Sequence, residues 1–375
     1  MKVLITGADG FVGKNLRLHL AERKDVQIAC FTRTNGVAEL PALLEGADFV
    51  FHLAGVNRPQ DPQEFATGNV DLTQGLCRAV GALAEATGKK VPILYTSSTQ
   101  AGLDNPYGNS KRGAEEALQV AARDFGIPVH VFRLPNVFGK WCRPNYNSAV
   151  ATFCHNIARD IPIEVNDSAA AVTLVYVDDV IERFLQLMNG ADAMVNADGF
   201  ATVMPQYTTT VGELAWQIQS FKDSRNNLMT DRVGTGLVRA LYSTYVSYLP
   251  PESFAYTVPQ HGDARGVFVE MLKTPDAGQF SFFTAHAGIT RGGHYHHSKT
   301  EKFLVIRGQA CFKFRHMQTG ETHELVTTGG KAEIVETVPG WTHDITNIGT
   351  EEMVVMLWAN EVFDRVRPDT FACPL

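Results

Sequence analysis

A glycine-rich turn near residue 7 could hold the phosphates of a dinucleotide. The strand predicted over Val3–Thr6 runs into glycines at positions 7, 10 and 13, and a helical pattern follows. Glycines let the backbone approach a pyrophosphate, whose charge is stabilised by the free N–H groups at the helix start. The alternative is an ordinary helix start, but the place of the turn between a strand and a helix favours cofactor binding. The residues expected to contact the cofactor are Gly7, Gly10, Phe11, Val12 and Gly13.

The second predicted strand ends at Phe31-Thr32-Arg33, about twenty residues further on. An acidic side chain at this place would bind the 2′-hydroxyl of the adenosine ribose, whereas a cation favours a 2′-phosphate. Arg33 therefore favours NADPH as the cofactor, unless it is a solvated turn residue.

Tyr107 and Lys111 share one face of a predicted helix, because residues four apart lie one turn apart. The lysine ammonium group can stabilise the tyrosine phenolate and bring its pKa toward the working pH of an acid–base catalyst. A hydroxyl run, Thr96-Ser97-Ser98-Thr99, follows a buried strand just upstream, where a hydroxyl can donate a hydrogen bond to a substrate carbonyl. Together these residue types suit proton transfer to a ketone.

A second group of chemistry-bearing residues lies in the last third of the chain, where most of the histidines are found. His294 and His296 would point the same way along a strand. Glu301 and His343 on later strands can complete three nitrogens and one oxygen, a set suited to a first-row divalent metal. His297 would face the other side and is expected to be a surface group or a neighbour of the ligands. The alternative is a metal-free barrel.

The run from His261 to Glu270 contains an arginine that could bind a diphosphate. Arg265 would make two parallel hydrogen bonds to phosphate oxygens. The same run could also be a glycine turn that opens a strand and leaves the arginine exposed.

Two kinds of predicted element position these residues. Up to residue 200, apolar strands alternate with helical patterns, which argues for a doubly wound parallel sheet. These strands are predicted over Lys2–Thr6, Gln27–Thr32, Asp48–Leu53, Pro92–Thr96 and Pro128–Leu134. Further helical patterns are predicted over Val177–Met188 and Val211–Phe221. Pro250-Pro251 disfavours both helix and sheet and marks the predicted domain boundary. Beyond it, short strands separated by glycine turns indicate an all-β sandwich or barrel, so the domains are expected to cover 1–249 and 250–375.

Composition excludes several classes of protein. The chain has 375 residues, 45% of them hydrophobic, so it can form a large core and shows no bias toward disorder. Its net charge of −7 argues against a nucleic-acid surface. The sequence shows neither a secretory signal nor an apolar run long enough for a membrane span, and its six cysteines form no C-x-x-C pair. We therefore expect a cytoplasmic protein with reduced thiols.

Several motifs in residues 1 to 245 resemble extended short-chain dehydrogenase/reductases of the nucleotide-sugar type. Beside the glycine turn and the Tyr107/Lys111 pair, these are His52-Leu53-Ala54-Gly55, Asn69-Val70, the run from Arg133 to Gly139, and Tyr176-Val177-Asp178-Asp179-Val180. The resemblance implies a Rossmann-like fold. It implies Ser98 or Thr99, Tyr107 and Lys111 as catalytic residues, Leu53, Ala54 and Gly55 as further cofactor contacts, and Asn136 near the sugar-nucleotide diphosphate.

Two departures from this family matter. Only a short segment separates Arg33 from Asp48, so the usual third strand and its adenine contact are expected to be shortened. Nucleotide-sugar dehydratases carry an acidic pair beside the catalytic hydroxyl, because elimination needs a base and an acid. Here the sequence reads Thr99-Gln100-Ala101, which argues against dehydration.

Residues 254 to 375 resemble the cupin family, with its jelly-roll fold and its two metal-binding motifs. The run around Arg265 resembles that of cupin-fold 4-keto-sugar epimerases. The whole chain, including Arg143 and Asn147 in the expected substrate segment, resembles bifunctional enzymes of capsular-polysaccharide synthesis. That resemblance implies C-3 epimerisation of a UDP-2-acetamido-2,6-dideoxy-4-keto-hexose by the cupin, followed by NADPH-dependent C-4 reduction to the L-talose configuration. It also implies zinc and a homo-oligomer, either a dimer or a tetramer.

Three other functions stay open. The chain could be a nucleotide-sugar 4-epimerase that recycles tightly held NAD, or a reductase whose cupin only mediates oligomerisation or senses a ligand. A non-catalytic NADP sensor is the third, although the set of Ser98, Tyr107 and Lys111 argues against it. The base that removes the C-3 proton is not identified by sequence, and the candidates near the metal motif are Tyr295, His297, Lys302 and Asp344.

Overall fold

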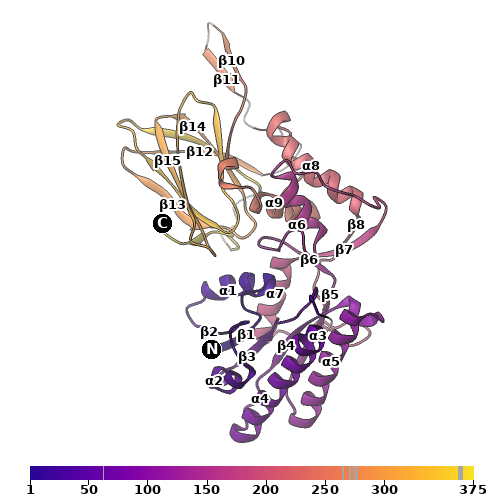
Figure 1. Ribbon diagram of the computed structural model, residues 1–375. Helices are drawn as coiled ribbons and strands as arrows, with labels where there is room; N and C mark the ends of the chain where they lie inside the picture. The colour runs from indigo at the N-terminus through magenta and orange to yellow at the C-terminus, as the bar shows by residue number, and fades with distance from the viewer. Residues whose placement is uncertain (62, 264–265, 270–271, 273, 275–277, 362–365) are drawn as a thin grey trace. The chain divides into compact units, whose positions relative to one another are not determined.

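A computed structural model describes the chain except for residues 62, 264–265, 270–271, 273, 275–277 and 362–365 (Figure 1). The chain forms two compact units. Unit 1 contains Met1–Phe138 and Thr173–Thr208, and unit 2 contains Gly139–Val172 and Thr209–Leu375. The segments 139–172 and 209–249 therefore belong to the same unit as the all-β part of the chain.

A five-stranded parallel sheet in the order β2-β1-β3-β4-β5 forms the centre of unit 1 (Figure 1). Its strands are β1 (Lys2–Thr6), β2 (Gln27–Phe31), β3 (Phe49–His52), β4 (Ile93–Ser98) and β5 (Val129–Leu134). Helices cover both faces of such a sheet, so its strands are near-continuous apolar runs. This confirms the predicted doubly wound architecture.

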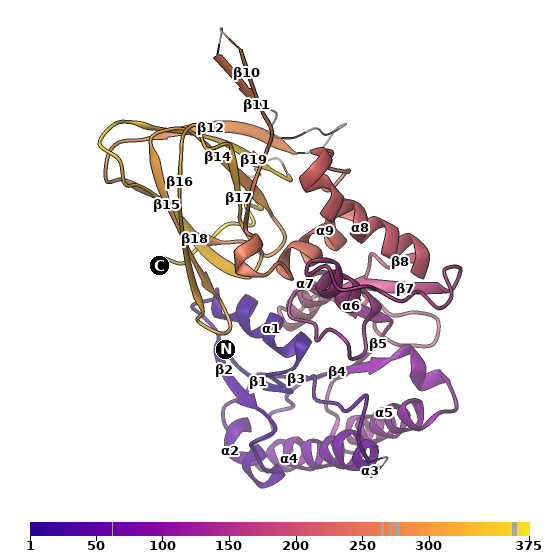
Figure 2. The ribbon, with the colours of Figure 1, turned by 45° about the horizontal axis from the view of Figure 1, so that its top comes forward.

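The helices of unit 1 form two layers, one on each face of the sheet (Figure 2). Helices α2, α4 and α5 lie on one face, where Leu76 and Leu118 join a core with Val50. On the other face α1 contacts α7, whose Phe184 packs against Phe51 and Phe132. The helical elements are α1 (Phe11–Ala21), η1 (Val37–Glu39), α2 (Leu40–Leu44), α3 (Gln63–Phe65), η2 (Ala66–Asp71), α4 (Leu72–Thr87), η3 (Thr99–Gly102), α5 (Pro106–Phe125) and α7 (Val177–Met188).

The strand order reverses at β1, which lies between β2 and β3. Ligands of open α/β sheets bind in the crevice at such a switch point, beyond the carboxyl ends of the strands. The glycine turn after β1 and the segment Leu53–Gly55 after β3 both follow these ends. Strand β2 is an edge of the sheet, which agrees with the short interval between Arg33 and Asp48 in the sequence.

A small second sheet has the order β6-β7-β8, with β6 parallel to β7. Its strands are β6 (Asn136–Phe138), β7 (Ala171–Tyr176) and β8 (Tyr207–Thr210). No helix in the described part of the chain is long and apolar enough to cross a bilayer.

Unit 2 contains two five-stranded antiparallel sheets, as expected for a jelly-roll. One has the order β12-β19-β14-β17-β9 and the other β16-β15-β18-β13-β20. The sheets face each other, because Phe303 of the first contacts Phe312 and His343 of the second. Their strands are β9 (Ala255–Thr257), β12 (Gln279–Ala285), β13 (Thr290–Tyr295), β14 (Glu301–Arg307), β15 (Gln309–His316), β16 (Thr322–Thr328), β17 (Glu333–Glu336), β18 (Trp341–Asn347), β19 (Met353–Ala359) and β20 (Phe371–Ala372). Strands β10 (Gln260–Asp263) and β11 (Gly266–Val269) pair with each other as a separate two-stranded antiparallel sheet.

The remaining helices of unit 2 are α6 (Ala149–Ile157), α8 (Val211–Asn227), α9 (Gly236–Ser247) and η4 (Pro251–Ser253). A buried ion network connects helix α8 to the first sheet. Arg225 of α8 and Lys302 of β14 both pair with Glu336 of β17. The phenol of Tyr242 on α9 donates to the same carboxylate. Helix α8 is six residues longer than the predicted segment 211–221, because its polar last turns are held by this network.

Candidate functional site

The glycine turn of unit 1 requires glycine at the positions where the chain approaches itself. Gly7 has φ +68°, and a Cβ atom there would lie 2.6 Å from the backbone nitrogen of Ala54. A Cβ at Gly13 would lie 2.2 Å from the carbonyl oxygen of Gly7. Gly10 precedes α1 and offers no side-chain cap, and the first turn of α1 has no acidic residue. The start of α1 can therefore accept an anion.

Replacing Gly7 by alanine should destabilise unit 1 and weaken cofactor binding. The matched control is Gly88→Ala, because Gly88 has a similar φ of +74° but a Cβ added there would meet no other atom within 4 Å. We expect the control to lose about 1 kcal/mol of unfolding free energy from backbone strain alone. Gly7→Ala should lose more and should raise the dissociation constant of the nicotinamide cofactor, as measured by urea unfolding and fluorescence titration. Equal effects of the two variants would contradict the role of close approach.

A chain of hydrogen bonds fixes the ends of strands β1 and β3. The hydroxyl of Thr73 donates to the carbonyl of Asn69 at 2.6 Å, so it accepts from His52 Nε2 at 2.8 Å. His52 Nδ1 then accepts from Thr6 Oγ1 at 2.6 Å. Burial first, and then the charge of Lys111, lowers the pKa of His52 to about 3, so the ring is neutral. This chain of bonds links the ends of β1 and β3 to α4.

The predicted cofactor residues after β3 lie directly beside Lys111, the lysine of the predicted catalytic set. A Cβ at Gly55 would lie 3.0 Å from Lys111 Nζ and 3.2 Å from Asn69 Oδ1. The amide of Asn69 holds this segment through both backbone groups of Val56, at 2.7 and 2.9 Å. The structure therefore brings Gly7, Leu53–Gly55 and Lys111 close together.

Lys111 is buried at the end of β4. Its ammonium group donates to the carbonyl of Thr96 at 2.9 Å and to the phenol of Tyr95 at 3.3 Å. Burial lowers the pKa of Lys111 to about 8, although Glu115 opposes the shift. A lysine with this pKa holds its charge at neutral pH and can release a proton under mildly basic conditions.

Tyr107 stands in the first turn of α5, one turn before Lys111. The helix begins at Pro106 because the side chain of Asn105 caps it, accepting from the backbone nitrogen of Gly108 at 2.8 Å. A Cβ at Gly108 would lie 2.2 Å from the carbonyl oxygen of Gln100, so the start of α5 packs closely against η3. Tyr107 is half-buried and contacts Phe65, with ring centroids 6.0 Å apart.

The residues of the hydroxyl run differ in their burial and in their hydrogen-bond partners. Ser97 is buried and bonds to Glu115, which also pairs with Arg133. Ser98 is half-buried, caps η3 by accepting from Gln100 N at 3.2 Å, and alternates with Ser97 along β4. Thr99 is exposed. Of the two predicted hydroxyls, Ser98 has the more fixed position.

The other predicted binding residues lie at the surface or outside the described residues. Arg33 is exposed in the turn after β2, two residues beyond Phe31, whose carbonyl accepts from Gly7 N at 2.9 Å. Asn136 in unit 1 is exposed and donates to the carbonyl of Thr173 at 3.2 Å. In unit 2, Arg143 and Asn147 are exposed, with Arg143 placed over the ring of Tyr146 at 4.9 Å.

Arg265 lies outside the described residues.

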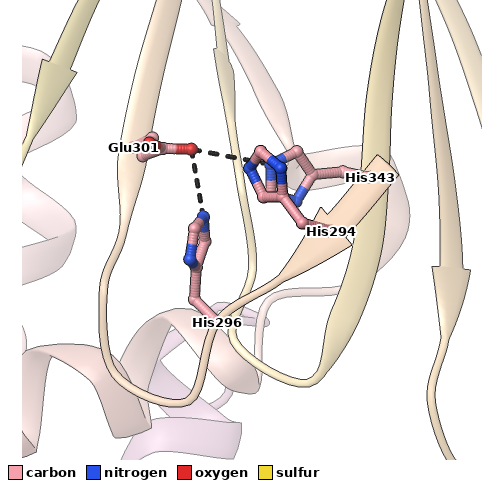
Figure 3. Close-up of side chains that lie close together, drawn as sticks. All are labelled: His294, His296, Glu301 and His343. Atoms are coloured by element: carbon pink, nitrogen blue, oxygen red, sulfur yellow. Dashed lines mark hydrogen bonds and ion pairs between the residues drawn. The ribbon is translucent and has the colours of Figure 1, made fainter. Parts of the chain in front are cut away.

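The four predicted metal ligands converge in unit 2 (Figure 3). Their ligand atoms all lie within 4.8 Å of one another, and His296, Glu301 and His343 are buried. Glu301 Oε2 lies 3.2 Å from His296 Nε2 and 3.5 Å from His343 Nε2. His294 on β13 is the direct cross-strand neighbour of His343 on β18, and their ring centroids are 4.8 Å apart.

The hydrogen-bonding state of the histidines fits a cation at their centre. His296 Nδ1 donates to the carbonyl of Asp369 at 2.6 Å, so a neutral His296 presents the lone pair of Nε2 to the Glu301 carboxylate. Two lone pairs in contact repel unless a cation or a proton separates them. Neither buried ring nitrogen of His343 makes a hydrogen bond to any part of the chain that the structure describes. Donor atoms around a tetrahedral zinc ion, with bonds of about 2.1 Å, are about 3.4 Å apart, which matches this spacing.

The charges of the set also suit a divalent ion. Burial, followed by the neighbouring His343 and His296, lowers the pKa of His294 to about 4. Although burial opposes ionisation, His296, His343 and Lys299 hold the pKa of Glu301 well below its usual value. The set therefore offers a neutral His294 and an ionised Glu301 near neutral pH, and imidazole and carboxylate groups are ligands that a first-row divalent metal accepts.

The four residues named as possible C-3 bases do not join the ligands. Lys302 alternates with Glu301 along β14 and pairs with buried Glu336 on the opposite face. Tyr295 and His297 both contact the ring of Phe371. Asp344 alternates with His343 along β18.

Sequence reasoning missed Asp369, which holds the loop between His296 and Glu301. Its carboxylate accepts from the backbone nitrogens of His297, Ser298 and Lys299, at 2.9, 2.9 and 2.7 Å. Asp369 lies about seventy residues after this loop, so no local pattern connects the two.

Two family models match the chain. Residues 3–200, more than half of the chain, match the NAD dependent epimerase/dehydratase family. Residues 261–371 match the polysaccharide biosynthesis C-terminal domain.

Some known proteins are similar to this chain over its whole length, and others are similar to part of it. A UDP-2-acetamido-2,6-beta-L-arabino-hexul-4-ose reductase of Pseudomonas aeruginosa is 64% identical over 373 residues, covering 100% of this chain and 98% of that protein. The crystal structure of the capsular polysaccharide assembling protein CapF from Staphylococcus aureus is 41% identical, covers 100% of both chains and has a TM-score of 0.66. The UDP-glucuronic acid 4-epimerase of Bacillus cereus in complex with NAD is 20% identical, covers 60% of this chain and 84% of its own, and has a TM-score of 0.51. This last likeness shows the fold alone.

Proposed function

This chain belongs to the NAD dependent epimerase/dehydratase family, and we propose that it is a bifunctional nucleotide-sugar enzyme of polysaccharide biosynthesis. Unit 1 reduces the C-4 ketone of a UDP-2-acetamido-2,6-dideoxy-hexose, and the metal-binding barrel of unit 2 first epimerises C-3 of the same 4-keto sugar. The product is UDP-2-acetamido-2,6-dideoxy-L-talose, on the route to UDP-N-acetyl-L-fucosamine for a capsule or O-antigen. The reductase of Pseudomonas aeruginosa, 64% identical, supports the reduction step.

One observation carries the reductase proposal. Lys111 is buried beside Gly55, in the segment that contacts the glycine turn. Tyr107 lies one turn away on α5, and Ser98 lies at the end of β4. A bound nicotinamide supplies the hydride that C-4 accepts. Tyr107 delivers the proton to the C-4 oxygen, Ser98 donates a hydrogen bond to the same oxygen, and the charge of Lys111 favours the phenolate that results.

The barrel supplies the conditions for the second step. A C–H bond beside a ketone becomes acidic when the enolate is stabilised, and a divalent ion held by His294, His296, Glu301 and His343 supplies that stabilising charge. The walls around this set are buried and partly aromatic, with Phe303 and Phe314 each 6.4 Å from His343 between ring centroids. Exclusion of water strengthens the electrostatic stabilisation.

The proposal includes several finer assignments. NADPH is the reductant, supported by the cation at Arg33 beyond β2. Zinc is the ion, supported by the donor set and its spacing. Asn136, Arg143, Asn147 and Arg265 bind the substrate, the protein acts as a cytoplasmic homo-oligomer, and residues 1–249 and 250–375 are its two functional domains.

One experiment tests the function directly. The protein is incubated with a 4-keto UDP-sugar in deuterated water, with and without NADPH, and the products are analysed by NMR. We expect deuterium at C-3 under both conditions, and a reduced C-4 only when NADPH is present and is consumed.

The other candidate functions predict different results. A 4-epimerase would invert C-4 without net NADPH consumption. A barrel that only mediates oligomerisation or sensing would give reduction with no deuterium at C-3. A cofactor sensor would bind NADPH and leave the sugar unchanged.

A further inference from the structure

The loop from His296 to Glu301 carries a metal ligand at each end. It joins β13 to β14, and residues 296–300 are buried although they form neither helix nor strand. A loop that could move would separate His296 from Glu301 and cost metal affinity, because ligand positions must be held closely for tight binding. The groups that fix the loop therefore affect the metal site without touching the ion.

The two ends of the loop are held by different residues. At the Glu301 end, Thr300 exchanges hydrogen bonds with Asn360, and Glu301 does the same with Thr337. At the His296 end, Gly340 N and Ser243 Oγ donate to the carbonyls of His296 and Ser298, and the carboxylate of Asp369 accepts four hydrogen bonds. Its Oδ1 accepts from His297 N, and its Oδ2 accepts from Ser298 N, Lys299 N and the hydroxyl of Ser298 at 3.0 Å.

Asp369 also fixes the ring of His296. Its backbone carbonyl accepts from His296 Nδ1, which leaves Nε2 as the nitrogen that faces Glu301. Asp369 has φ +34°, a left-handed conformation that is uncommon outside glycine, so its surroundings impose this geometry.

The strand after Asp369 joins the same segment to the other ligands. Strand β20 pairs with β13, placing Ala372 opposite His294, and Cys373 N donates to the carbonyl of Gly293 at 2.7 Å. The hydroxyl of Thr342, beside His343, donates to the carbonyl of Cys373 at 2.5 Å. Residues 369–373 therefore contact the segments that carry three of the four ligands.

We propose that Asp369 is a positioning residue of the metal site, which holds the 296–299 loop so that His296 Nε2 stays within coordinating distance of the position shared with Glu301. The inference rests on the proposed metal site. It goes beyond that site because Asp369 acts through the backbone of the loop and not as a ligand.

The test measures metal affinity, using Asp369→Asn in the full-length protein. Asparagine keeps the volume but replaces one carboxylate oxygen by an NH₂ group, which faces backbone N–H donors. We expect the dissociation constant of Zn²⁺, measured by competition with a chelator, to rise by about 10-fold to 100-fold. The visible absorption spectrum of the Co²⁺-substituted protein should also change, because it reports the geometry of the ligands.

The matched control is Glu351→Gln, which removes an exposed carboxylate that pairs with Arg307 on β14. This control should bind Zn²⁺ like the wild type. The melting temperature of the metal-free Glu351→Gln protein should match that of the wild type, while the gain in melting temperature on adding Zn²⁺ should be smaller for Asp369→Asn.

Each other outcome has a distinct meaning. Wild-type Zn²⁺ affinity and an unchanged Co²⁺ spectrum in Asp369→Asn would overturn the positioning role. If Asp369→Asn does not fold, Asp369→Glu keeps the charge but displaces the carboxylate by one methylene from the three backbone nitrogens, and unchanged affinity and spectrum there would overturn it as well. Failure of the wild type to bind Zn²⁺ or Co²⁺ would instead contradict the proposed metal site.

Discussion

Replacement of Tyr107 by phenylalanine should lower the kcat of ketone reduction by about 100-fold to 10,000-fold, the usual contribution of a positioned general acid. The phenol is the group proposed to protonate the C-4 oxygen, and phenylalanine keeps the ring that contacts Phe65. The dissociation constant of NADPH should change little, because the glycine turn and the Leu53–Gly55 segment are intact. Stopped-flow absorbance of NADPH oxidation, with a 4-keto UDP-sugar as substrate, measures the effect.

Tyr95→Phe is the informative comparison for this variant. Tyr95 is the phenol whose oxygen accepts from Lys111 Nζ at 3.3 Å. Burial raises the pKa of Tyr95 well above its usual value, so this phenol is a weaker acid. We expect Tyr95→Phe to lose less than about 10-fold in kcat, below the range for a general acid. A near wild-type rate for Tyr107→Phe would refute the assignment of the proton donor.

Simultaneous replacement of His294 and His343 by alanine should abolish both metal binding and C-3 exchange. These histidines are cross-strand neighbours, so the double variant removes two of the four ligands from one side of the set. We expect the metal content, measured by mass spectrometry after dialysis, to fall below about 10% of the wild-type value, because two ligands do not hold a divalent ion. Incorporation of deuterium at C-3 should disappear with it.

The reductase gives the internal control for this prediction. With a 4-keto sugar that already has the inverted C-3, the double variant should still oxidise NADPH, because the glycine turn, Tyr107 and Lys111 are unchanged. His286→Ala, which removes an exposed histidine paired with Glu352, should keep both activities. Full metal occupancy in the double variant would show that the ligands are other residues.

Local patterns were sufficient to predict the architecture and to name the four side chains that converge in unit 2. The alternation of apolar strands and helical patterns predicted the parallel sheet, and α7 begins and ends where its periodicity does, at Val177–Met188. The metal-ligand set could be named because His294, His296 and Glu301 lie close together in the chain and residue alternation on strands fixes which side chains share a face. These signals are short-range, so each can be read within a stretch of about ten residues.

Only the folded chain shows which of these residues meet and what holds them. Three features join residues that are distant in sequence. Gly7 approaches Ala54, Lys111 lies beside Gly55, and Asp369 forms hydrogen bonds with the 296–299 loop. The extension of α8 to Asn227 has the same origin, because Arg225 is held by Glu336 more than a hundred residues away. Burial and backbone hydrogen bonding between distant segments decide these features, and neither leaves a periodic pattern in the sequence.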